Sequence, residues 1–395
     1  MRNAVETAIS EGKTLRWFTK ELTPVLQSKG WWGKQEHVDQ DTGEVNQVQL
    51  GSPWRLQTIY RTNLQTAYMA GRYAEQMANV DDRPYWMYVA ILDSRTRPSH
   101  RAMNGKVFRY DDPFWQSFYP PNGWGCRCRV VALSHDEIIV RGIKVEAAGD
   151  RLGTTLKLVN EKTGELREVA TFRTVDPVTR REIVVSPDVG WSYNPGAAAW
   201  QPDLSRYTGD LGTIARGGIA VSDFVNFQID DSALRTRLLQ LEQAGHQKAG
   251  AMRKIAQALV LVTEDNFAAQ GRPRWQALSE ATIHMRVGGK KAYKKNGELT
   301  AAASRRKAGL MILQDSGQMA ASVSTDHDDN SAVIGSNKEY AAIHQFGGQA
   351  GRGLKVTIPA RPWLPVTADG ELQPEAVEPV LNTILRHLMD AANRR

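Results

Sequence analysis

Three side chains whose chemistry suits a metal ion lie in one stretch of this 395-residue chain. Cys126 and Cys128 are two residues apart, so both thiols point to the same face of an extended strand. His100 lies upstream and can supply an imidazole nitrogen. Zinc prefers these ligand types in a tetrahedral set of four, and Asp93, His135 or water would have to complete the set. The residue pattern leaves a zinc site and a metal-free cluster open.

A catalytic metal is a further alternative, because three protein ligands and one open position form the arrangement of a metal-dependent hydrolase. Asp93, His100 and Asn122 would then be the candidates for a nuclease or a DNA-processing site. The sequence places no second carboxylate cluster and no recognisable nuclease motif beside them. We therefore favour a structural interpretation and predict that the protein is not an enzyme.

Two features near the C-terminal end also invite a catalytic or binding interpretation. His344 has no nucleophile or carboxylate at a matching spacing, so we expect it to bond to the backbone at a structural corner. The glycines from Gly347 to Gly353 precede a strand and not a helix, so the helix N-terminus that binds phosphate is missing. We predict a flexible, basic hairpin tip that carries Arg352 and contacts a neighbouring subunit or DNA.

The strongest strand signals are two short apolar runs, residues 89–92 and 128–133, each bounded by turn residues. The long connection between them contains seven aromatic side chains. Long connections without regular structure are usually functional or internally packed, so we predict a satellite core there. A hairpin is expected next, with strands at residues 156–159 and 166–170.

Helical spacing of apolar residues appears twice near the N-terminal end, at residues 3–29 and 53–79. Ser52 is the expected N-cap of the second helix, because Pro53 suits a first turn. The segment from Gly30 to Gly51 between them is predicted to be a polar loop.

The composition shifts to Gly, Pro, Ala and Ser after residue 197, and we place a domain linker at residues 201–228. Leucines from residue 234 and the apolar run at 255–262 predict one or two long helices, broken or loosened near Gly245 and Gly250. The remaining expected elements are antiparallel strands at 322–324 and 332–335, a short helix or turn at 340–346 that ends at two glycines, and a last helix at 377–388.

A net charge of +7 permits contact with DNA but does not by itself indicate it. The most basic cluster falls between residues 286 and 307, and we expect a solvated, mobile loop first and a phosphate contact second. Its members are Lys290, Lys291, Lys294, Lys295, Arg305, Arg306 and Lys307. Two cysteines in so long a chain fit a reducing compartment. The apolar run at 255–262 is far shorter than the ~18–20 residues of a membrane helix, so no membrane contact is expected.

Several linked motifs in the first half resemble the phage Mu protein F-like minor head proteins. They are Tyr85-Trp86-x-Tyr88, Leu92-Asp93-x-x-Thr96-x-Pro98-x-His100, Gly105-Lys106-Val107-Phe108, Pro120-Pro121-Asn122-Gly123-Trp124-Gly125-Cys126-Arg127-Cys128 and Gly190-Trp191-Ser192-Tyr193-Asn194-Pro195-Gly196. The resemblance implies a helical N-terminal part at residues 1–80 and a minor head domain at residues 81–200. It begins part-way into the usual length of the family.

Many proteins of this family carry a cysteine pair where this chain has Arg97 and His100, which gives four sulfurs together with Cys126 and Cys128. Arg97 at one of these positions favours a charge-assisted hydrogen-bond network in place of the metal. We therefore predict no cofactor, with structural zinc as the alternative. Arg97 and Trp124 are expected to be structural anchors.

Residues 229–395 resemble the Mu G-like virion morphogenesis proteins, which are related to tail completion proteins. The motifs are Arg272-Pro273-Arg274-Trp275-Gln276-Ala277-Leu278-Ser279, Leu313-Gln314-Asp315-Ser316-Gly317-Gln318-Met319, Val333-Ile334-Gly335-Ser336, Tyr340-Ala341-Ala342-Ile343-His344-Gln345-Phe346 and Ile358-Pro359-Ala360-Arg361-Pro362-Trp363-Leu364. The structural anchors expected from this resemblance are Tyr340, His344, Phe346, Arg361 and Trp363.

Together the resemblances imply an α+β chain, in which N-terminal helices and a small mixed minor-head domain precede a second domain of long helices and an antiparallel sheet. They imply a minor head protein fused to a virion morphogenesis protein, acting in prohead assembly and head–tail completion through protein contacts. Expected partners are portal and major capsid proteins, head–tail connector or tail-end proteins, packaged DNA and further copies of the chain. We expect the protein in the virion, at the head or the head–tail junction, after assembly in the host cytoplasm.

Overall fold

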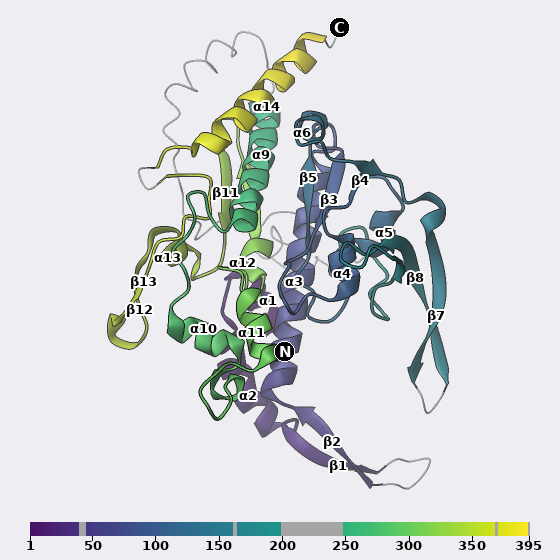
Figure 1. Cartoon of the computed structure of the whole chain (residues 1–395), viewed down its shortest axis with the longest axis vertical. Coiled ribbons are helices and arrows are strands. Elements are labelled where there is room, and N and C mark those ends of the chain that lie inside the picture. The colour runs from purple at the N-terminus through teal and green to yellow at the C-terminus, as the bar shows by residue number, and fades with distance from the viewer. Residues whose placement is uncertain (39–44, 161–163, 199–247, 368–369, 394–395) are drawn as a thin grey trace.

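The computed structural model describes residues 1–38, 45–160, 164–198, 248–367 and 370–393. Helices and several small sheets alternate along the chain, which confirms the predicted α+β class. Helices α3 (Pro53–Met77) and α9 (Lys248–Ala269) run through the middle of the molecule (Figure 1). In the same view, strands β3, β4 and β5 lie on one side of these helices and the β12–β13 hairpin lies on the other.

Three helices form the N-terminal end of the chain, where helical spacing predicts them. They are α1 (Arg2–Ser10), α2 (Leu15–Ser28) and α3. The Ser52 hydroxyl accepts a hydrogen bond from the Arg55 backbone N–H at 3.1 Å, which confirms the predicted cap. The break between α1 and α2 includes Gly12, whose φ of +62° favours glycine. A Cβ there would also overlap the Asn337 carbonyl, so a close approach between distant segments requires this glycine.

The segment between α2 and α3 forms a hairpin, so the predicted polar loop from Gly30 to Gly51 is wrong. Strands β1 (Gly33–Val38) and β2 (Val45–Gly51) pair antiparallel. Most of their described side chains are exposed, so no core face imposes the alternation of apolar and polar residues that marks a strand in a sequence. Backbone pairing defines these strands, and the side-chain pattern gives little sign of it.

A four-stranded sheet lies at the centre of the first half. Its order is β5-β3-β4-β6, with β3 antiparallel to both β4 and β5 and with β4 parallel to β6. The strands are β3 (Tyr85–Val89), β4 (Val107–Arg109), β5 (Arg129–Leu133) and β6 (Val145–Glu146), and the short helices α4 (Pro98–Met103), α5 (Phe114–Phe118) and α6 (His135–Val140) connect them.

The strand predicted at 89–92 lies four residues earlier, because β3 ends at Val89. The Ala90 backbone N–H leaves the ladder and donates to the Asn104 side chain at 2.8 Å. The apolar side chains of Ala90 and Ile91 are nevertheless buried. A buried turn and a buried strand therefore carry the same apolar signal, and only the backbone pairing distinguishes them.

The aromatic residues between β3 and β5 are packed, as predicted, but they belong to the main core and do not form a separate satellite core. Phe108, Phe114 and Phe118 are fully buried, and Phe114 stacks on Phe118 with ring centroids 4.9 Å apart. The same cluster includes Phe18 of α2 and other residues of the N-terminal helices. The connection therefore fixes the helices against the sheet.

A second sheet follows, in the order β7-β8-β9, and includes the predicted hairpin. Strands β7 (Leu152–Asn160) and β8 (Glu165–Val175) contain the predicted segments, and β9 (Glu182–Val185) pairs with β8. The helical turn η1 (Gly149–Arg151) precedes β7. Phe172 of β8 packs edge-on against Phe114 at 5.0 Å, which connects this sheet to the aromatic core.

The second half contains the expected strands, the short helix with its two glycines, and the last helix. After α9 come α10 (Glu280–Val287), η3 (Gly289–Ala292), α11 (Ala301–Ala308), α12 (Gln318–Ala321), β10 (Val323–His327), β11 (Ala332–Ser336), α13 (Ala341–Phe346), β12 (Gly348–Ala350), η4 (Arg352–Leu354), β13 (Val356–Ile358) and α14 (Pro374–Asn393). Strands β10 and β11 are antiparallel, as predicted. The proposed linker at 201–228 and the leucines from residue 234 lie outside the described residues.

Gly250 is the third residue of the described part of α9, and the helix is unbroken after it, while Gly245 lies outside the described residues. The helix packs against α14, β10, β11 and β5, and Leu259, Leu261 and Val262 are buried. Burial of this kind outweighs the roughly 1 kcal/mol that a glycine costs inside a helix. No helix among the described residues is long and apolar enough to cross a membrane.

The basic segment from residue 286 to 307 has regular structure, so the prediction of a loop is wrong for its last part. The Thr300 hydroxyl accepts from the Ala303 backbone N–H at 3.2 Å and caps α11, whose alanines favour a helix. Arg306 donates to the Val287 carbonyl at 3.3 Å and holds α11 against the end of α10.

Candidate functional site

His100, Cys126 and Cys128 converge in the interior of the first half. His100 lies in α4, and the two cysteines lie just ahead of β5. The His100 Nδ1 atom is 3.3 Å from the Cys128 Sγ atom and 3.6 Å from the Cys126 Sγ atom. No residue of the three is more than 8% exposed. The structure therefore brings together the three ligand-type side chains that the sequence singles out.

The pKa values of the two cysteine thiols are shifted in opposite directions. Burial by itself raises the pKa of both thiols. For Cys126, hydrogen bonds from Cys128 and His100 outweigh burial and lower the pKa well below its usual range. The pKa of Cys128 is raised well above its usual range, because its thiol proton is held beside the Cys126 sulfur. Cys126 is therefore the more acidic thiol of the pair.

The spacing of the three ligand atoms fits part of a zinc site. They lie within 4.8 Å of one another, and neighbouring nitrogen and sulfur ligands on a tetrahedral zinc would be about 3.6 Å apart. The expected fourth ligands are engaged elsewhere. Asp93 is bound by Arg127, and the His135 ring lies 6.1 Å from the Tyr85 ring, beyond the opposite end of β5. Three residues can hold the ion, and an exogenous ligand would have to complete the set.

Asp93 is the centre of a network of arginines. Arg127 binds it through both terminal nitrogens, at 2.6 and 2.8 Å, and Arg95 contributes a bond of 3.2 Å. Burial alone would raise the pKa of Asp93, but the bonds from Arg127 lower it to about 2. Arg95 also binds Asp315 at 2.9 Å, so the network reaches the second half of the chain.

Arg97 forms a separate pair beside the cysteines. Its guanidinium binds the Asp188 carboxylate at 2.8 Å and the Trp124 carbonyl at 2.5 Å. A Cβ at Gly123 would collide with both Asp188 and Arg97, which explains the glycine in this motif. Trp124 is 56% exposed and packs edge-on against Trp191 at 5.4 Å. The ion pair of Arg97 with Asp188 therefore anchors this segment more than the Trp124 side chain does.

The candidates for a nuclease belong to two networks. Asp93 lies among the arginines, whereas His100 and Asn122 are linked through Cys128 and the Tyr88 hydroxyl. His100 bonds to the cysteines and Asp93 to Arg127. The Asn122 Oδ1 atom accepts from the Tyr88 hydroxyl at 2.9 Å. These contacts use the groups that a metal or an attacking water would need, so the described geometry does not assemble the three side chains as a catalytic set.

Trp363 and Arg361 hold the last extended segment in place. Trp363 is 1% exposed and donates from its indole to the Ala341 carbonyl at 3.3 Å. The Arg361 side chain donates to the carbonyls of Gln276 and Ala277 at 3.0 and 3.1 Å. Both residues thus connect segments that are far apart in the sequence.

His344 lies at a corner of the backbone, but its buried ring Nδ1 atom has no hydrogen-bond partner among the described residues, so this atom does not form the expected bond to the backbone. Its carbonyl accepts from the Arg361 backbone N–H at 2.7 Å, and its ring lies 6.1 Å from the Tyr340 ring. Burial and the charge of Arg361 lower the pKa of His344. Phe346 is 51% exposed at the end of α13.

The basic candidates are distributed over several elements. Lys290 and Lys291 lie in η3, Arg305, Arg306 and Lys307 in the last turn of α11, and Arg352 in η4 at the hairpin tip. Lys294 pairs with Glu298 at 3.1 Å. A contact of these residues with DNA remains a prediction.

Comparison with known proteins assigns the two halves. A family model described as Phage Mu protein F like protein matches residues 1–131, and one described as Phage virion morphogenesis family matches residues 229–389. The chain is 48% identical over 206 residues to the Putative capsid assembly protein F of Escherichia phage Mu, which covers 51% of this chain and 46% of that protein. It is 36% identical over 138 residues to the Mu-like prophage FluMu G protein 2 of Haemophilus influenzae, covering 35% of this chain and 80% of that protein.

A further relative is the Putative capsid assembly protein G of Escherichia phage Mu, 30% identical over 155 residues, with 37% of this chain and 86% of that protein covered. The chain belongs to the phage virion morphogenesis family, and a Mu F-like part precedes its morphogenesis region in the sequence. It spans about half the length of the curated F relatives. No solved structure matches it. We call residues 1–198 the F-like part and residues 248–393 the morphogenesis part.

The two parts are joined by a buried ionic cluster. Glu264 of the morphogenesis part binds Arg72 of the F-like part at 2.9 Å and Arg129 at 2.5 Å. None of the three is more than 5% exposed. Arg72 also donates to the Ala320 carbonyl at 3.0 Å. Buried ions destabilise a fold unless they are paired and hydrogen-bonded, so this cluster requires the two parts to be in contact.

Other polar contacts follow the same interface. Arg386 on α14 donates to Asp82 and Asp136 of the F-like part at 3.1 and 3.0 Å. The Asn337 side chain donates to the Ile9 carbonyl at 2.8 Å and accepts from the Tyr68 hydroxyl at 3.2 Å. The parts are therefore packed directly on one another.

The interface residues were not identified from the sequence, although one signal was present. Glu264 directly follows the apolar run at 255–262, which indicates a buried helix, but its neighbours Thr263, Asp265 and Asn266 are polar. Arg72 and Gln76 are four residues apart on the buried face of α3. The sequence therefore indicates that the helix packs in the interior, but it does not show that Glu264 is buried or which residues pair with it.

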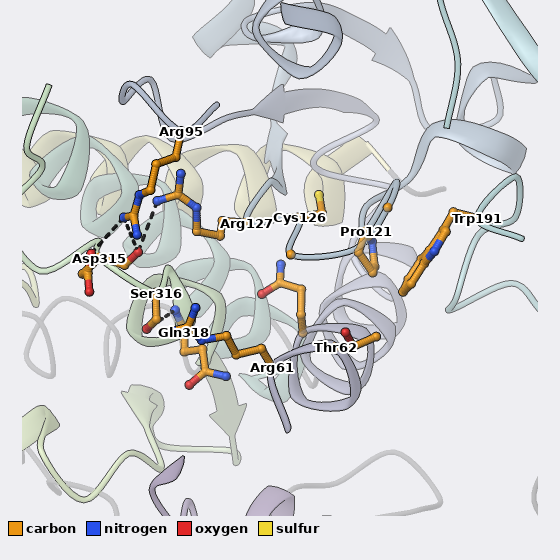
Figure 2. A pocket seen from close by; sticks show the side chains of 13 residues that line it. Arg61, Thr62, Arg95, Pro121, Cys126, Arg127, Trp191, Asp315, Ser316 and Gln318 are labelled. Carbon is orange, nitrogen blue, oxygen red and sulfur yellow. Dashed lines mark hydrogen bonds and ion pairs between the residues drawn. The ribbon is translucent and has the colours of Figure 1, made fainter. Parts of the chain in front are cut away.

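A pocket of about 160 Å³ lies between the two parts (Figure 2). Figure 2 shows Arg95, Arg127 and Asp315 together at one end, with Pro121 and Trp191 at the other. The polar side chains that line it are Arg61, Thr62 and Gln65 of α3, Arg95 and Arg127 of the F-like part, and Asp315, Ser316 and Gln318 of the morphogenesis part. Cys126 lines this pocket and also the neighbouring cavity that contains His100 and Cys128.

Proposed function

We propose that this chain is a non-enzymatic phage assembly protein that acts in the prohead and at the completion of the head–tail junction. The relatives of both parts support an assembly role, since two of them are named putative capsid assembly proteins of phage Mu. The observation that carries the proposal is the buried cluster of Arg72, Arg129 and Glu264 between the parts.

This cluster bears on how such a protein would work. A flexible tether would fix the ratio of two modules and raise the effective concentration of one near the other. Direct packing across buried ions also fixes their orientation. One molecule would then present an F-like surface and a morphogenesis surface in a defined geometry to different partners.

The partners in this proposal are phage structural proteins. For the F-like part they are the portal and major capsid proteins, and for the morphogenesis part the head–tail connector or tail-end proteins. Packaged DNA and further copies of the chain are additional partners in the proposal. The protein would be found in the virion, at the head or at the head–tail junction.

A phage with an amber codon in this reading frame tests the role directly. Grown without a suppressor, it should yield few infectious particles, and electron microscopy should show defective heads or heads and tails that are not joined. A plasmid with the wild-type chain should restore the yield, and one with an amber codon at the same position should not. A normal yield of joined particles without the chain would overturn the proposal.

A further inference from the structure

The pocket of Figure 2 has an excess of positive charge. Three arginines, Arg61, Arg95 and Arg127, and one carboxylate, Asp315, line it. Two further charged residues form salt bridges with these lining residues, namely Arg286 with Asp315, and Asp93 with Arg95 and Arg127. Four positive and two negative charges leave a surplus of two positive charges. Such a surplus at a partly buried site is unfavourable unless a ligand or solvent compensates it.

Arg61 accounts for much of this surplus. It is half-buried in α3, and none of the described residues accepts a hydrogen bond from its guanidinium or forms an ion pair with it. Burial lowers its pKa, Asp315 opposes this effect, and Arg95 and Arg127 add to it. A guanidinium nevertheless stays protonated at neutral pH. Arg61 therefore keeps its charge without a partner.

Two buried polar side chains of the pocket also lack partners. The Gln318 Nε2 atom and the Thr62 Oγ1 atom are buried and make no hydrogen bond with the described residues. Gln318 is only 6% exposed, and both residues line the pocket. Buried polar groups are almost always hydrogen-bonded, so unsatisfied ones indicate a missing partner. Because an amide N–H and a hydroxyl are both donors, an acceptor would satisfy them.

The two carboxylates do not fill this need. Asp93 is held by Arg127 and Arg95, and Asp315 is held by Arg95 at 2.9 Å and by Arg286 at 3.3 Å. Asp315 does line the pocket, and it would repel an anion. Its two arginine partners offset that repulsion. The free donors are at Arg61, Thr62 and Gln318.

We propose that this pocket binds a phosphate group, as inorganic phosphate or as a phosphate monoester. A phosphate carries a charge of about −1.5 to −2 at neutral pH, which matches the surplus. Arginine recognises its oxygens through paired N–H donors. The volume of about 160 Å³ is far larger than the roughly 10–15 Å³ that one water molecule occupies. The ligand would contact both parts and stabilise their packing.

This proposal goes beyond the assembly role and does not depend on it. The test is isothermal titration of the full chain with inorganic phosphate at pH 7.5, at constant ionic strength set with chloride. We expect saturable binding with one site per chain. Arg61→Gln should weaken it about tenfold or more, because it removes a charge-assisted hydrogen bond. Arg16→Gln, at an exposed arginine of α2, is the matched control and should leave binding unchanged.

Thr62→Val keeps the test decisive if Arg61→Gln does not fold, since it removes one hydroxyl at constant shape. It should weaken phosphate binding several-fold. Competition with short duplex DNA, with and without a 5′-phosphate, then distinguishes the sources. Displacement only by the phosphorylated duplex identifies a monoester, and displacement by neither identifies free phosphate. Absence of saturable binding, binding that neither substitution weakens, or binding of glutarate but not of phosphate would each overturn the proposal.

Discussion

At the scale of single residues, the ligands available to the cluster of His100, Cys126 and Cys128 depend on how the neighbouring charged side chains are paired. Arg97 lies close to the cysteines but pairs with Asp188, and Asp93 pairs with Arg127. Asp93 is therefore not available as a fourth ligand, and the Arg97 guanidinium has no lone pair to offer a metal. The pKa of Cys126 is lowered and that of Cys128 is raised, so the two thiols are not equivalent.

This geometry leads to a prediction about metal content. Purified protein should contain well under one zinc ion per chain by mass spectrometry of the metal, because only three protein ligands are present and a structural zinc needs four. Cys126→Ser should leave the metal content unchanged. Stoichiometric zinc that is lost in Cys126→Ser would contradict this prediction and favour a three-residue site closed by an exogenous ligand.

A second residue, Lys338, leads to a pH-dependent prediction. It is 3% exposed, its Nζ atom has no hydrogen-bond partner among the described residues, and it lies over the rings of Tyr68 and Tyr60 at 5.0 and 5.9 Å. Burial lowers its pKa from 10.5 to about 7, against a weak opposing effect of Glu339. Between pH 7 and pH 10.5 the unfolded chain therefore holds a proton that the folded chain has lost, so Lys338 destabilises the fold most below pH 7 and least above pH 10.

Lys338→Met should therefore stabilise the protein at pH 6.5, by about 2 kcal/mol after allowance for the lost cation–π contacts. The gain should shrink towards pH 9.5. Urea denaturation at both pH values measures it, and Lys20→Met, at an exposed lysine of α2, is the control. A gain that is equal at both pH values would contradict the assigned cause.

At the scale of elements, α3 and β5 of the F-like part meet α9 of the morphogenesis part through the buried cluster of Arg72, Arg129 and Glu264. The helices themselves follow from the sequence, because apolar spacing and the Ser52 cap are local signals. The polar β1–β2 hairpin does not, because backbone pairing decides it. Long-range packing likewise decides the burial of Glu264 and its pairing with Arg72 and Arg129, so local sequence signals do not reveal them.

The buried cluster predicts unequal effects for two neighbouring acidic residues of α9. Glu264→Gln leaves two buried arginines without their counter-charge and should destabilise the full chain by about 3–5 kcal/mol. Asp265→Asn breaks a half-exposed pair with Arg141 and should cost at most about 1 kcal/mol. Chemical denaturation of the two variants measures the difference. Equal effects would show that the cluster does not hold the parts together.

At the scale of the whole molecule, two parts that resemble separate phage proteins are packed through buried polar contacts. The motifs of each part predicted its family from the sequence, since residue order and spacing are local properties. Their packing was not predicted, because it depends on pairs such as Arg386 with Asp82 that are 304 residues apart. The proposed domain boundaries remain predictions, and the linker at 201–228 lies outside the described residues.

The most direct measurement of the assembly role is quantitative mass spectrometry of this chain in purified immature heads, free tails and mature virions of its phage. We expect a few copies per particle in immature heads. Retention of these copies in mature virions would agree with a location at the head or the head–tail junction. Recovery of the chain only in the soluble fraction of the lysate, with none in any particle or assembly intermediate, would contradict the assembly role.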